Sequence, residues 1–82
     1  MEVNIENLRK TLRAEVDQSL SIEELKNDDN FVDYGIDSLD RSSFFLAIED
    51  NFGVHISDKE VDSLETLNAL LDYIIVKQKG KS

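Results

Sequence analysis

The sequence of 82 residues contains no cysteine, no proline, only three glycines and one histidine. Without cysteine, neither a disulfide framework nor a cysteine-ligated metal site can stabilise the fold. No apolar run is long enough to span a membrane, and the acidic N-terminal segment lacks the apolar core of a signal peptide. We therefore expect a single domain over residues 1–82, a cytoplasmic location and no membrane insertion.

Basic residues are scarce as well. Nine Lys and Arg stand against eighteen Asp and Glu, which gives a net charge of −9. Between Glu15 and Asp72 there are sixteen acids and only three bases, Lys26, Arg41 and Lys59. Such a surface repels nucleic acid and anionic membranes and attracts basic partners. Acidity would equally keep a small domain soluble, so the charge alone leaves both interpretations open.

Apolar residues recur at helical spacing along most of the chain, and no stretch alternates as a strand does. The spacing and the N-cap residues predict helices over residues 4–17, 38–51 and 58–63, and a last helix that begins after Thr66. The sequence thus predicts an all-α fold, a small bundle of three longer helices plus one short helix, with a frayed tail at about 78–82. The expected core consists of Leu8, Leu12, Phe44, Ile48, Phe52, Leu67, Leu71 and Ile74.

A long loop, residues 18–36, joins the first two helices. A loop of this length in a small domain is either functional or pinned to the core by its side chains. One turn of helix is expected near Ile22, and four apolar residues are expected to anchor the end of the loop: Phe31, Val32, Tyr34 and Ile36. The acids of the loop do not form an EF-hand, because a loop with Gly35 at its sixth position lacks carboxylates at its third and fifth positions. We expect no metal site.

The second predicted helix begins at a serine. Gly35 suits a turn, Asp37 and Ser38 are both favourable N-cap residues, and Asp40 follows Asp37 at capping-box spacing. Ser38 therefore presents a hydroxyl where free backbone N–H groups and the helix dipole favour a phosphate. From position alone, an ordinary N-cap serine is the more common explanation. A catalytic pair of Ser38 and His55 is disfavoured, because no glycine-rich elbow surrounds the serine.

Three stretches resemble acyl carrier proteins: Asp37-Ser38-Leu39 within GIDSLD at 35–40, AIEDNFGV at 47–54 and LDYI at 71–74. The resemblance extends over roughly residues 5–76. It implies that Ser38 carries a covalent 4′-phosphopantetheine arm, which a phosphopantetheinyl transferase attaches, and that the chain is no enzyme. By the same resemblance Gly35 and Asp37 set the presentation of the serine.

The resemblance also implies a docking face on the second helix, with Leu39, Asp40, Arg41, Leu46 and Glu49. Two exposed leucines rimmed by carboxylates suit a small partner surface. The partners would be acyl-loading, synthase and acyltransferase enzymes with basic docking patches, and the carrier itself would be a monomer.

The sequence departs from the common pattern at Arg41 and at Ser42-Ser43, which predicts a specialised carrier with its own partners. Fatty acid, modified-lipid, polyketide and aminoacyl pathways are all open. The alternative from another class is an acidic helical interaction module that is never modified.

Overall fold

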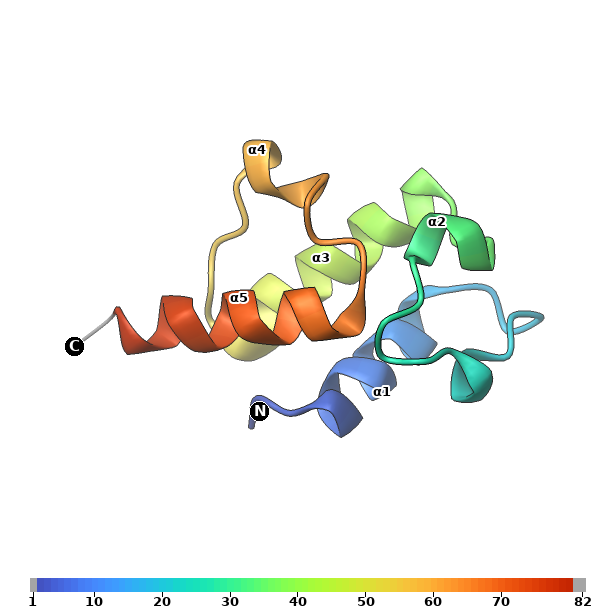
Figure 1. The fold of residues 1–82 in the computed structure, drawn as a ribbon, viewed down its shortest axis with the longest axis horizontal. Coiled ribbons are helices and arrows are strands. Elements are labelled where there is room, and N and C mark those ends of the chain that lie inside the picture. The colour runs from blue at the N-terminus through green and yellow to red at the C-terminus, as the bar shows by residue number, and fades with distance from the viewer. Residues whose placement is uncertain (1, 81–82) are drawn as a thin grey trace.

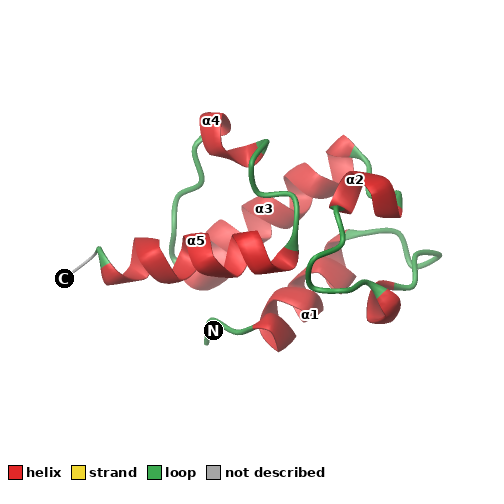
Figure 2. Cartoon of the chain, in the orientation of Figure 1, coloured by secondary structure: helices red, strands yellow, loops and turns green. Residues whose placement is uncertain are grey.

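The structure is a computed structural model that describes residues 2–80, and helices are its only regular elements in this range (Figure 2). The helices are α1 (Ile5–Glu15), α2 (Phe31–Tyr34), α3 (Ser38–Phe52), α4 (Asp58–Val61) and α5 (Leu67–Lys79), with one turn of 3-10 helix, η1 (Ile22–Glu24). The predicted bundle of three longer helices is confirmed (Figure 1). The short helix α2, which the sequence analysis did not predict, lies in the long connection immediately before α3.

Side chains cap the N-termini of α1 and α5. The Asn4 side chain accepts a hydrogen bond of 2.7 Å from the Asn7 N–H, and the Thr66 hydroxyl accepts one of 3.0 Å from the Ala69 N–H. Each cap satisfies a backbone donor that has no partner within its own helix. At the end of α3, Gly53 takes a left-handed conformation with φ of +66°, which glycine adopts without steric cost.

Several predicted boundaries were wrong by a few residues. The first helix was predicted to reach residue 17, but it ends at Glu15 and Val16 is already extended. The second helix continues past residue 51 to Phe52, and α4 ends at Val61 instead of residue 63. The tail at about 78–82 was predicted to fray; α5 extends to Lys79, and residues 81–82 lie outside the described range.

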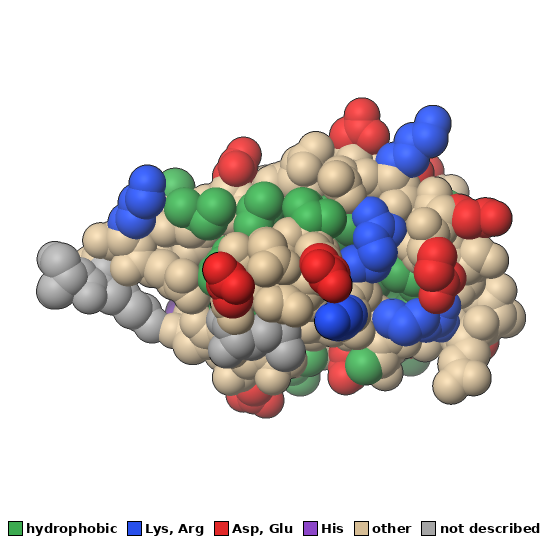
Figure 3. Space-filling model, turned by 90° about the horizontal axis from the view of Figure 1, so that it is seen from below, with side chains coloured by type: hydrophobic (Ala, Val, Ile, Leu, Met, Phe, Trp, Pro, Cys, Tyr) green, Lys and Arg blue, Asp and Glu red, His purple; other side chains and the backbone are tan. Residues whose placement is uncertain are grey.

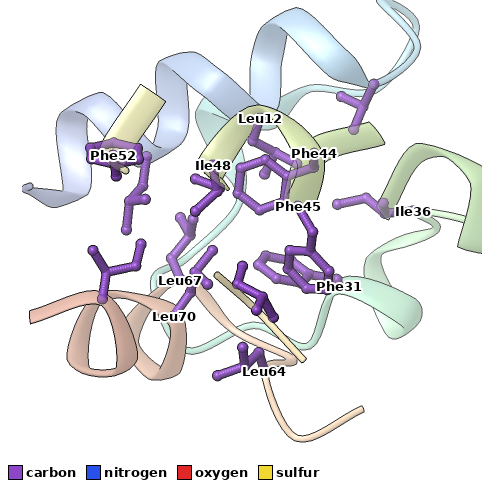
Figure 4. Packing of buried hydrophobic residues seen from close by; sticks show 14 of the residues in the cluster. Leu12, Phe31, Ile36, Phe44, Phe45, Ile48, Phe52, Leu64, Leu67 and Leu70 are labelled. Atoms are coloured by element: carbon purple, nitrogen blue, oxygen red, sulfur yellow. The ribbon is translucent and has the colours of Figure 1, made fainter. Parts of the chain in front are cut away.

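The core lies where α1, α3 and α5 meet. Its largest rings come from α2 and α3: Phe31 packs edge-to-face against Phe44 with 5.9 Å between ring centroids, and Phe45 lies beside Phe44 (Figure 4). All the predicted core residues are buried except Leu71, which is half-buried at the edge of the cluster. Leu70, one residue earlier, is fully buried in its place.

The long connection is pinned to this core at several points along its length. Its buried side chains are Ile22, Leu25, Phe31 and Ile36. Two backbone hydrogen bonds tie it to the start of α5: the Phe31 N–H donates to the Glu65 carbonyl (2.8 Å), and the Asn68 N–H donates to the Asn27 carbonyl (3.0 Å). Val32, predicted as a further anchor, is 55% exposed. In a four-residue helix only one face can meet the core, and Phe31 occupies that face.

Charge is unevenly distributed over the surface. The face seen from the α1 side, in Figure 3, gathers Lys and Arg side chains with Asp and Glu around them. Arg9, Lys10 and Arg13 of α1 line a shallow pocket there together with Ile22. No helix in the described part of the chain is long and apolar enough to cross a membrane.

The excess of carboxylates predicts that salt stabilises the fold. Like charges on a chain of net charge −9 repel one another, and added NaCl screens this repulsion. The melting temperature should therefore rise between low and moderate ionic strength, as measured by circular dichroism. A control with Asp28→Asn and Asp72→Asn, both exposed, should melt higher at low salt and respond less to NaCl. A melting temperature that stays flat or falls with added salt contradicts this explanation.

Candidate functional site

A tight corner between α2 and α3 determines where the candidate serine lies. Gly35 closes α2 in a left-handed conformation with φ of +103°. Its N–H donates to the Val32 carbonyl, and the Ile36 N–H donates to the Phe31 carbonyl, the pairing of a Schellman motif. The side chains of Ile36 and Phe31 are both buried. The chain is therefore fixed by its backbone and by the core immediately before α3 begins.

Ser38 is the first residue of α3, and its side chain is exposed. Asp37 is the N-cap, and its carboxylate accepts a hydrogen bond of 2.8 Å from the Asp40 N–H. Within the described residues, the Ser38 hydroxyl and the backbone N–H groups of Ser38 and Leu39 have no hydrogen-bond partner. Unpaired N–H groups at the positive end of a helix dipole favour an anion, so this position suits a phosphate ester on the serine.

Two arginines of α1 hold the long connection in place, although the sequence analysis assigned no functional residue to this helix. The Arg9 guanidinium donates to the carbonyls of Ile22 and Leu25 and to the Asn27 side chain. Arg13 donates to the carbonyls of Leu20 and Asp17 and lies 3.9 Å from Glu23. These bonds satisfy carbonyl groups that a long loop cannot pair within itself. The arginines thus support the connection that leads to Ser38.

The exposed face of α3 carries two leucines. Leu39 is 78% exposed and Leu46 is 63% exposed, as the helical period predicted. Asp40, also placed on this face by the sequence, is half-buried. Isolated exposed leucines are common, but two on one helix face make an apolar surface that a partner can cover.

Glu49 is engaged within the molecule. Its carboxylate accepts a hydrogen bond of 2.7 Å from the Ile56 N–H and lies 3.2 Å from His55 Nδ1. The Tyr73 hydroxyl of α5 donates to the His55 carbonyl, and partial burial raises the pKa of that hydroxyl, which favours its protonated, donating form. Glu49 therefore fastens the segment that follows α3, and it is less available to a partner than the sequence suggested.

Ser38 and His55 do not form a catalytic pair. Ser38 is the first residue of α3 and His55 follows its last, and a helix of 15 residues is roughly 22 Å long. A nucleophile and its base must be within hydrogen-bond reach. No group of three or more His, Cys, Asp or Glu side chains in residues 2–80 could hold a metal ion.

A groove of about 250 Å³ lies between α3 and α4. Ser42, one turn after Ser38, is among its lining residues, and Phe45 contributes an apolar wall. Its remaining lining residues are Leu46, Glu49, Ile56, Asp58 and Val61. The groove thus combines an apolar wall with carboxylates at the rim, close to the turn of α3 that presents the serine.

Comparison with known protein families gives a match that covers the candidate site. A family model described as a phosphopantetheine attachment site matches residues 8–74, which is most of the chain. The matched range includes the corner at Gly35 and the start of α3, and the resemblance drawn from the sequence is thereby confirmed.

The bonds from Arg9 predict that its loss loosens the connection before the serine. Arg9→Gln should lower the free energy of unfolding by about 1–3 kcal/mol, since partly buried carbonyls lose their donors. It should also speed amide exchange in residues 20–30. Urea unfolding and hydrogen exchange measure these effects. The matched control is Lys10→Gln, which removes the same charge from an exposed side chain. Equal stability of the two variants would contradict the role given to Arg9.

Proposed function

Since the chain belongs to the family of phosphopantetheine attachment domains, we propose that it is an acyl carrier protein whose arm is attached to Ser38. Domains of this family hold 4′-phosphopantetheine covalently and are carriers, not enzymes. The arm supplies a terminal thiol that holds an acyl group as a thioester. The chain itself provides the attachment point, a rigid base for the arm and a surface that partner enzymes bind.

One observation carries the assignment to Ser38: its hydroxyl is exposed and unpaired at the first position of α3 within the described structure. Asp37 occupies the capping role that serine would otherwise take, so the hydroxyl is not needed for the helix. The backbone N–H groups of Ser38 and Leu39 remain available to the phosphate oxygens. These residues fit a phosphodiester at Ser38.

The exposed leucines of α3 support a docking role. Leu39 directly follows the serine, so a partner that receives the arm also meets this side chain. Asp40 and Asp50 add carboxylates near the two leucines, which suits basic patches on a transferase or on acyl-transferring enzymes. We propose Leu39, Asp40 and Leu46 as the centre of this face, because Glu49 is held by His55 and Ile56.

The groove and the departures in α3 support a proposal for cargo and pathway. The groove between α3 and α4 is lined by Ser42, one turn after Ser38, and has Phe45 as an apolar wall, which suits part of an acyl chain. Its rim carries Glu49 and Asp58, so a cargo with polar groups is also compatible. Together with Arg41 and the serine pair at 42–43, this supports a specialised carrier in lipid or polyketide biosynthesis.

The first test concerns the attachment site. Incubation with a broad-specificity phosphopantetheinyl transferase should add the mass of one arm, and tandem mass spectrometry should locate it on Ser38. Ser38→Ala should remain unmodified, whereas a control with Ser42→Ala and Ser43→Ala should be modified like the wild type. An arm on Ser42 or Ser43 would disprove the assignment. An unmodified mass both after this treatment and in protein from the native host would favour the interaction module.

The second test concerns docking. Leu39→Ser should lower kcat/KM for arm transfer by about ten- to a hundredfold, because covering a leucine contributes about 1.5–3 kcal/mol and 1.4 kcal/mol corresponds to a factor of ten. The melting temperature should hardly change, since the side chain is exposed. Val76→Ser, which alters an exposed residue on α5, is the matched control. Equal kcat/KM for the two variants would remove Leu39 from the docking face.

A further inference from the structure

Arg41 is an isolated base next to the serine. It is the only Lys or Arg between Lys26 and Lys59. Its side chain is half-buried, and it forms no ion pair and no hydrogen bond through its guanidinium within the part of the chain that is described. In particular, it does not pair with Asp37 or Asp40, the two nearest carboxylates in sequence. A half-buried arginine without a partner has donors available for a group outside the protein chain.

The helix places this side chain close to Ser38. Residues three apart are neighbours on a helix, with about 5–6 Å between their Cβ atoms. Side chains in a helix also lean toward its N-terminus, so Arg41 extends over the turn that begins with Ser38. At 100° per residue, Arg41 and Leu39 lie on opposite sides of Ser38 around the helix axis.

We propose that the Arg41 guanidinium binds the phosphodiester that joins the arm to Ser38, and this inference rests on the function proposed above. Asp37 and Asp40 flank the serine, so a phosphodiester there is repelled by two carboxylates. The planar guanidinium offers two parallel donors to phosphate oxygens and offsets that repulsion. Arg41 is thus a positioning residue for the base of the arm.

The position of Arg41 also determines on which side of Ser38 the base of the arm is held. Because Arg41 and Leu39 lie on opposite sides of Ser38, binding of the phosphate holds the base of the arm away from Leu39. The exposed leucines then stay open to partner enzymes while the arm is attached. Weakening the contact frees the base of the arm, and the contact should weaken with salt because it is only half-buried.

The experiment compares apo and modified protein by NMR, after mass spectrometry has established one arm on Ser38. In the wild type, the Nε–H resonance of Arg41 should shift downfield on modification, whereas that of Arg9, whose guanidinium is already held by the carbonyls of Ile22 and Leu25, should stay in place. The ³¹P resonance of the phosphodiester should shift in Arg41→Gln and move back toward the wild-type position in Arg41→Lys. Lys26→Gln, which removes an equal charge from an exposed position, should leave it unchanged.

Each result decides the proposal. A ³¹P resonance that is the same in wild type and Arg41→Gln, or an Arg41 Nε–H that does not respond to modification, overturns it while the arm on Ser38 still stands. If mass spectrometry finds no arm on Ser38, the proposed function fails first and the inference fails with it. The Nε–H measurement needs only the wild-type protein, so it decides even if Arg41→Gln does not fold.

Discussion

The left-handed backbone at Gly35 is the constraint on which the site depends. An L-residue in this conformation costs roughly 1–2 kcal/mol, whereas glycine adopts it freely. It lets α2 end and α3 begin after only three intervening residues, and the buried side chains of Phe31 and Ile36 fix the corner to the core. The exposure of Ser38 follows from this, because the corner directs the first turn of α3 away from the residues that anchor it.

Hydrogen bonds to the long connection before α2 also support the corner. The guanidinium groups of Arg9 and Arg13 bind carbonyls of the connection between α1 and α2, and backbone bonds from Phe31 and Asn68 tie that connection to the α4–α5 segment. A small domain buries only about 60% of its unfolded surface, so a long loop cannot be held by apolar contacts alone. Here the charge-assisted hydrogen bonds from Arg9 and Arg13 of α1 add to the apolar contacts that hold the loop. These two side chains act mainly as hydrogen-bond donors within the molecule.

The few basic residues of this acidic chain make different kinds of contact. Arg9 and Arg13 pair with carbonyls inside the molecule, and Lys10 forms an exposed pair with Glu6. Arg41 follows Ser38 by three residues and its guanidinium has no ion-pair or hydrogen-bond partner within the described residues, which suits it as the counter-charge of the proposed phosphodiester. The carboxylates of α3 also have different roles. Glu49 holds the segment after the helix, whereas Asp40 lies near the exposed leucines.

Local signals in the sequence determined the long helices, their caps at Asn4, Asp37 and Thr66, most of the core and the place of Ser38 at a helix start, because helical period and capping are set by neighbours in the chain. The tertiary structure decided what depends on distant partners. Arg9 and Arg13 hold the connection between α1 and α2 in place. Val32 is exposed because Phe31 occupies the face of α2 that meets the core. Glu49 accepts a hydrogen bond from the loop that follows its own helix. No spacing rule predicts these contacts, because their energies arise only when segments far apart in the sequence are brought together.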